Sequence, residues 1–95
     1  MRSAGPRAPT VQSISAADHR RLATLYREKA ERFERQALQE EEQLAYYEEH
    51  AAAFPTKYPT PPDSARKLAQ YYRLAASKAK AQATAEESLA SQLAN

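Results

Sequence analysis

The chain has 95 residues, of which 42% are hydrophobic, and it contains one Gly, no Cys and no Trp. A chain this short forms one domain at most, and its bias toward Ala, Glu, Lys, Leu and Arg is typical of long helices rather than of sheets. The lack of cysteine excludes disulfides, thiolate metal sites and thiol catalysis. The net charge is only +2, with both signs intermixed, so bulk charge indicates no partner.

Residues 1–14 are predicted to form a flexible Pro/Ser-rich tail, because Gly5, Pro6 and Pro9 oppose helix formation. The tail lacks the apolar stretch of a secretory signal, and no run in the chain reaches the roughly 18 to 20 apolar residues that span a bilayer. We therefore expect a cytoplasmic location by default, and a periplasmic one if the chain is the mature form of an exported protein.

A first helix is predicted over residues 15–54. Ser15 and Asp18 have the spacing of a capping box, and Pro55 is expected to end the helix because the residue before a proline disfavours the α conformation. Between these limits, apolar residues recur in heptads, with Glu40 as the exception. The two rows are Ala23, Ala30, Ala37, Leu44 and Ala51, and Tyr26, Phe33, Glu40, Tyr47 and Phe54.

A Pro-rich elbow is predicted over residues 55–62, with a PxxP-type ligand as the alternative interpretation. A second helix is predicted over residues 60–94, with Thr60 as the cap and Pro61 at the first helical position. Small residues dominate its heptad rows and favour close antiparallel packing. The two rows are Ala69, Ala76, Ala83 and Ala90, and Ala65, Tyr72, Ala79, Glu86 and Leu93.

The two helices resemble copies of each other at an offset of 46 residues. The segment 22–27 matches the segment 68–73, and the same offset carries Ala30 onto Ala76 and Glu40 onto Glu86. Each helix also begins basic and ends acidic, so folding the chain back at the elbow sets opposite charges side by side. The fold predicted is an all-α, coiled-coil-like antiparallel hairpin with approximate two-fold character.

Further apolar residues flank the heptad rows and widen the apolar surface beyond what one partner helix covers. A second hairpin would cover them, so we expect a four-helix bundle formed by homodimerisation or by docking on a larger protein assembly. The residues predicted to make this interaction are Leu22, Leu25, Leu38, Tyr46, Leu68, Tyr71, Leu74 and Leu89.

No catalytic or cofactor motif is present, since a single glycine cannot build a phosphate loop or a nucleophile elbow, and no enzyme activity or cofactor is expected. Basic residues early in the first helix alternate with Glu28, Glu31 and Glu34, which argues against nucleic-acid binding.

Four residues are candidates for a metal site, namely Glu40, Glu86, His19 and His50. The two glutamates occupy heptad-row positions, where they either pair with a nearby Lys or Arg, reach solvent, fix the register, or converge on a cation in a dimer. The simpler interpretation of His19 is a first-turn surface residue, and His50 suits the negative end of a helix. The two histidines lie roughly 45 Å apart along one helix, so they cannot share a site within one chain.

At His19–Ala30 and again at Leu68–Ala76, the chain resembles small exported bacterial α-hairpin proteins with repeated HxxLAxxYxxxA units. Members with a histidine in each unit would suggest metal binding, whereas here Glu41 and Ala65 stand at the matching later positions. The resemblance assigns no function and favours an envelope location. We expect a non-enzymatic interaction module or accessory subunit, with a periplasmic metal- or ligand-binding bundle at a dimer interface as the alternative.

Overall fold

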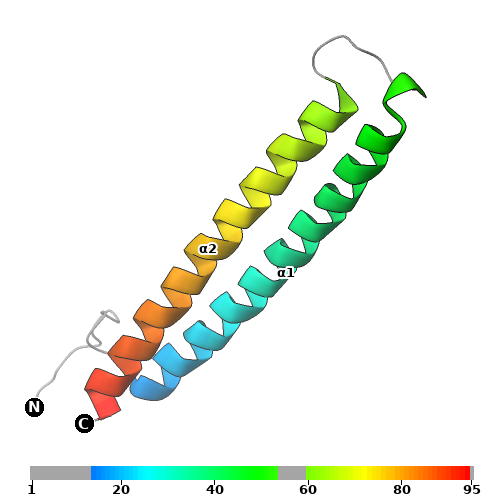
Figure 1. Cartoon of the computed structure of the whole chain (residues 1–95). Helices are drawn as coiled ribbons and strands as arrows, with labels where there is room; N and C mark the ends of the chain where they lie inside the picture. The colour runs from blue at the N-terminus through cyan, green and yellow to red at the C-terminus, as the bar shows by residue number, and fades with distance from the viewer. Residues whose placement is uncertain (1–13, 54–59, 95) are drawn as a thin grey trace, which may run out of the picture.

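The structure is a computed structural model that describes residues 14–53 and 60–94. Helix α1 spans Ala16–Glu49, a short 3-10 turn (η2) spans Ala51–Ala53, and helix α2 spans Pro61–Ala94. The two long helices lie side by side and antiparallel, so the end of α2 lies beside the start of α1 (Figure 1). The predicted all-α hairpin is confirmed, while the tail and most of the elbow fall outside the described residues.

The capping box at the start of α1 is formed as predicted. The amide of Asp18 donates to Oγ of Ser15 at 3.1 Å, and the amide of Ser15 donates to a carboxylate oxygen of Asp18 at 3.3 Å. Arg21 also pairs with Asp18 from the next turn. The backbone and side-chain hydrogen bonds of Ser15, followed by the contact with Arg21, lower the pKa of Asp18 below its ordinary value of 3.8.

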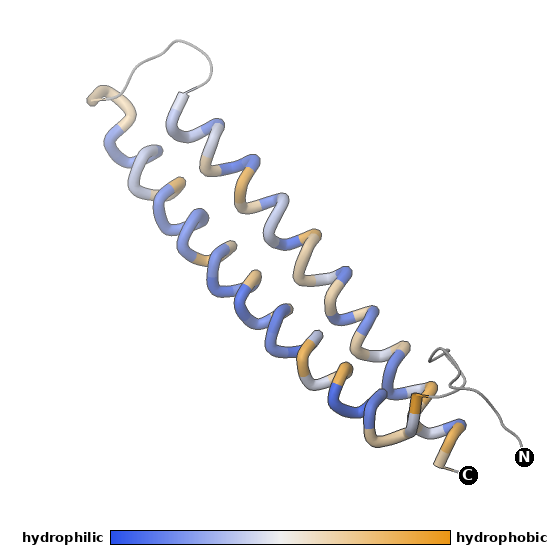
Figure 2. The backbone as a smooth tube through the Cα atoms, turned by 180° about the vertical axis from the view of Figure 1, so that it is seen from behind, coloured by the Kyte–Doolittle hydropathy of each residue, from blue (hydrophilic) through white to orange (hydrophobic). Residues whose placement is uncertain are grey.

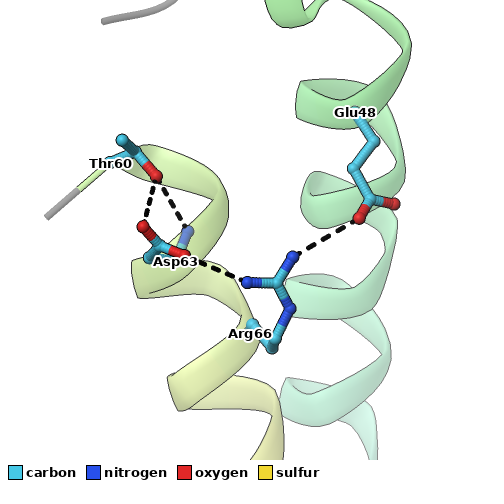
Figure 3. Close-up of polar contacts among 4 residues, drawn as sticks. All are labelled: Glu48, Thr60, Asp63 and Arg66. Carbon is cyan, nitrogen blue, oxygen red and sulfur yellow. Dashed lines mark hydrogen bonds and ion pairs between the residues drawn. The ribbon is translucent and has the colours of Figure 1, made fainter. Parts of the chain in front are cut away.

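The start of α2 is tied to α1 through its cap (Figure 3). The amide of Asp63 donates to the Thr60 hydroxyl at 3.3 Å, and this hydroxyl donates to the Asp63 carboxylate at 2.8 Å. The Thr60 hydroxyl, the Thr60 backbone contact and Arg66 lower the pKa of Asp63 below 3.8. The guanidinium of Arg66 lies 3.1 Å from Asp63 and 3.5 Å from Glu48 of α1, so it connects the cap to the opposite helix.

Helix α1 ends earlier than the proline signal predicts. The α-helix stops at Glu49, and the predicted end at Phe54 is wrong for the α conformation because a tighter 3-10 turn follows. The His50 amide donates to the Tyr46 carbonyl at 3.1 Å, and the Ala53 amide donates to the His50 carbonyl at 2.9 Å. Ala51, which the heptad pattern assigned to the packed seam, is therefore exposed.

The core is a seam of alanines between the helices. Its buried apolar residues are Ala23, Ala30, Ala37, Ala65, Ala69, Ala76, Ala79, Ala83 and Ala90. Phe33 and Tyr72 stack across the seam with ring centroids 6.2 Å apart. Leu93 is an exception to the predicted rows, since it is 53% exposed where α2 reaches the first turn of α1.

Hydrophilic positions predominate along both helices, and apolar ones interrupt them singly or in short groups (Figure 2). Neither of the described helices combines the length and apolar character needed to cross a membrane.

Candidate docking face

One side of the hairpin is closed by ion pairs between the helices. Four such pairs are formed, and their members follow one another at intervals of seven residues in each helix. They are Arg27–Glu87, Glu34–Lys80, Glu41–Arg73 and Glu48–Arg66. Residues seven apart share one face of a helix in a coiled coil. We call this row of pairs the ion-pair ladder, and it confirms the antiparallel arrangement that the charge pattern predicted.

The pair of Glu41 and Arg73 is two-pronged. Nε of Arg73 donates to one carboxylate oxygen at 3.0 Å, and a terminal nitrogen donates to the other oxygen at 2.7 Å. This fork-to-carboxylate contact lowers the pKa of Glu41 below its ordinary value of 4.5 and raises the pKa of Arg73 above its ordinary value. Its geometry fixes the register of the two helices, although exposed pairs contribute little to stability.

The ladder follows the internal repeat. The 46-residue offset carries Arg27 onto Arg73 and Glu41 onto Glu87, so the pairs Arg27–Glu87 and Glu41–Arg73 are repeat-equivalent. The same offset carries Glu34 onto Lys80. That pair maps onto itself and lies at the approximate two-fold axis of the hairpin. Exact sequence repetition would have placed two like charges there.

The opposite side of the seam has a different character. Residues on this side follow the alternating three- and four-residue steps of one helical face. The open face, as we name it, consists of Leu22, Leu25, Lys29, Arg32, Gln36, Gln39, Gln43 and Tyr46 of α1, and Leu68, Tyr71, Ala75, Lys78, Gln82, Ala85, Leu89 and Gln92 of α2. None of these positions carries Asp or Glu, and no interhelical ion pair among the described residues crosses this side.

The open face is accessible and shallowly hollowed along α1. Apart from the half-buried Leu22 and Ala75, its residues are exposed. One depression of about 300 Å³ is lined by Leu22, Leu25, Lys29 and Arg32 of the face, together with the neighbouring Tyr26 and Glu28. A second, of about 400 Å³, continues it past Arg32 along the glutamines. The two depressions share Lys29 and Arg32, and together they run along α1 from Leu22 to Gln39.

The middle of the open face is basic. By the register of the Glu34–Lys80 pair, Lys78 of α2 lies opposite residue 36 of α1. Lys29, Arg32 and Lys78 therefore lie within about two helical turns of one another, near the middle of the face. No described residue forms an ion pair with any of the three. The apolar residues lie toward the two ends of the face, and glutamines fill much of the space between them.

Six of the eight residues predicted to make an interaction share the open face. Leu38 does not, because it lies between Glu34 and Glu41 in sequence and on the ladder side. Leu74 lies on the outer surface of α2 and is 72% exposed. The structure therefore divides one predicted set into a shared face and two separate residues.

His19 is not the surface residue that its first-turn position suggested. It is only 4% exposed, and its Nδ1 lies 2.5 Å from a carboxylate oxygen of the half-buried Glu86. Glu86 thus pairs with His19, and among the described residues it neither pairs with a Lys or Arg nor lies fully in solvent. A buried imidazole needs a polar partner, and the row position of Glu86 supplies one.

The other two metal candidates lie elsewhere. Glu40 is half-buried on the seam, and His50 lies at the end of α1, where its Nδ1 is 2.9 Å from the Tyr46 carbonyl oxygen and its ring stacks on Tyr46. Within residues 14–53 and 60–94, no three His, Cys, Asp or Glu side chains gather as a metal site would require. His19 and Glu86 are the one candidate pair that the fold brings together.

No family model, curated protein or solved structure shows a significant match to this chain.

Proposed function

We propose that the chain is a non-enzymatic docking module, which presents a preformed two-helix surface to another helical protein surface. The observation that carries this proposal is the division of the hairpin into two unlike sides. The ion-pair ladder occupies one side, and the accessible apolar and amide residues occupy the other.

The composition of the open face suits burial in an interface. Glutamine can exchange hydrogen bonds with a partner without the desolvation cost of a carboxylate, and the Leu and Tyr residues supply apolar contact area. The ladder holds the two helices in one register, so the face exists before a partner arrives. A preformed face avoids much of the ordering cost of association.

The test compares two exposed leucines of α1, one on each side of the hairpin. Leu25 on the open face is 58% exposed, and Leu38 on the ladder side is 52% exposed. A photo-crosslinking amino acid is placed at either position in cells that produce the protein. We expect a discrete adduct from position 25 and none from position 38. Identical patterns at the two positions, or no adduct at either, would contradict a docking role for the open face.

A further inference from the structure

We infer that the partner of the open face is an acidic amphipathic helix of another protein, with carboxylates at its middle and apolar residues toward its ends. This inference rests on the proposed docking function and specifies the chemistry of the partner. It follows from the basic residues at the middle of the open face and from the lack of Asp and Glu at the positions of that face.

A second copy of this chain does not complement the face. Any two-fold arrangement that overlaps two open faces in full brings the middle of one against the middle of the other. Lys29, Arg32 and Lys78 would then meet their own copies, and no residue of either face supplies a carboxylate. Like charges brought together in an interface oppose association and select against that pairing.

A helix fits the space that is available. The open face runs over 25 residues of α1, from Leu22 to Tyr46, whose ends lie about 36 Å apart at 1.5 Å per step. A third helix of similar length laid along the open face would cover Leu22 and Leu89 at one end and Leu68 and Tyr71 at the other. Carboxylates in its central turns would neutralise Lys29, Arg32 and Lys78, giving a three-helix arrangement.

The probe is a designed helical peptide of about 28 residues, with leucines along one stripe and glutamates flanking the stripe in its central turns. Its control replaces the glutamates with lysines. By fluorescence anisotropy in about 50 mM salt, we expect the acidic peptide to bind the full chain about tenfold more tightly than the basic one. The difference should shrink in about 500 mM salt because these charges are exposed and screened.

Two variants with the same change of charge locate the binding. Arg32→Glu alters the middle of the open face, whereas Arg20→Glu alters an exposed residue seven positions before Arg27, on the ladder side. We expect Arg32→Glu to lower the affinity for the acidic peptide about fivefold or more, and Arg20→Glu to change that affinity by less than about twofold. Circular dichroism of both variants verifies that they fold.

Three results would overturn the inference. They are equal affinity for the two peptides, equal effects of the two variants, and binding to vesicles of phosphatidylcholine with about one third phosphatidylserine in place of the peptide. If position 25 still crosslinks in cells, such a result leaves the docking function standing and removes only the acidic helix. If position 25 also fails to crosslink, both proposals fail together.

Discussion

Nδ1 of His19 and Oε1 of Glu86 lie 2.5 Å apart, across the seam and 67 positions apart in the chain. The pair occupies a layer of the core that is otherwise lined by alanines, near the open end of the hairpin. It gives the interior one polar contact whose partners can be satisfied only in this register.

Removing either member of this pair should destabilise the hairpin. We expect His19→Ala and Glu86→Ala each to lower the free energy of unfolding by about 1–3 kcal/mol, because the remaining polar group loses its partner inside the seam. The double variant should lose less free energy of unfolding than the two single variants lose together. Urea unfolding of the four proteins measures this coupling, and additivity within about 0.3 kcal/mol would show that the contact contributes nothing of its own.

The internal repeat predicts a second such pair. The 46-residue offset carries Glu40 onto Glu86 and His19 onto Ala65, so the Glu40–Ala65 layer is equivalent to the Glu86–His19 layer. Ala65→His should give Glu40 a partner and raise the melting temperature. The matched control is the same substitution in a Glu40→Ala background, where the buried histidine lacks a carboxylate and should destabilise the chain. A loss of stability in both backgrounds would refute the equivalence of the two layers.

The stability that the ion-pair ladder contributes should depend on opposite charges facing each other, whichever helix carries which sign. Arg73→Glu places two carboxylates together and should lower the melting temperature, and adding Glu41→Arg should restore much of it. The restoration should be larger at low salt than at high salt, because the pair is exposed. A double variant no more stable than the single one would argue that the pair has no part in setting the register.

The alanine seam should reject larger side chains. Ala37 is fully buried, and Ala37→Leu should lower the free energy of unfolding by about 1–3 kcal/mol, because the helices must separate to admit the side chain. Ala45→Leu, at an exposed position of the same helix, is the control and should have little effect. Equal stability of the two variants would contradict the close packing of the helices.

Acid should destabilise the hairpin. Asp18, Glu41 and Asp63 have lowered pKa values in the fold, so the unfolded chain takes up protons at these groups first. Their stabilising contribution is complete above the ordinary values of 3.8 and 4.5, and it is lost as the pH falls through the lowered folded values. The melting temperature should therefore fall as the pH is reduced below about 4.

Asp63→Asn provides the comparison for this pH dependence, since it removes one of the three groups. Its melting temperature should fall less steeply with acid than that of the parent chain. A melting temperature that is constant or rises between about pH 5 and pH 2.5 would contradict the assignment of these contacts.

Sequence patterns predicted the features that depend on local spacing. The caps at Ser15 and Thr60 and the alanine rows follow from side chains three, four or seven residues apart. The caps are present in the structure, and the alanines of the rows are buried except Ala51. The first-turn position of His19, taken alone, predicts a surface residue, and this prediction is wrong because the side chain is buried. Its place seven residues before Tyr26 put it on the second heptad row, and that signal was available.

The division of the hairpin into two unlike sides could be predicted only once it was known which residues of the two helices lie opposite each other. The distribution of charge along each helix predicts only that the helices pair antiparallel. The sequence does not separate Leu38 from the other apolar residues that flank the heptad rows. Once Glu34–Lys80 fixes which residues face each other, the steps of seven at Arg27, Glu34, Glu41 and Glu48 separate the ladder from the open face. The early end of α1 depends on a competition between two helix types, which the Pro55 signal does not resolve.

The most direct test of the central claim is the solution mass measured by light scattering, with and without the acidic peptide and at several protein concentrations. If the open face binds an acidic helix of another chain, the protein alone has the mass of one 10.6 kDa chain and takes up one peptide. A stable dimer that Leu25→Glu dissociates, while Leu38→Glu leaves it intact, would show that the open face binds its own copy and would contradict the account.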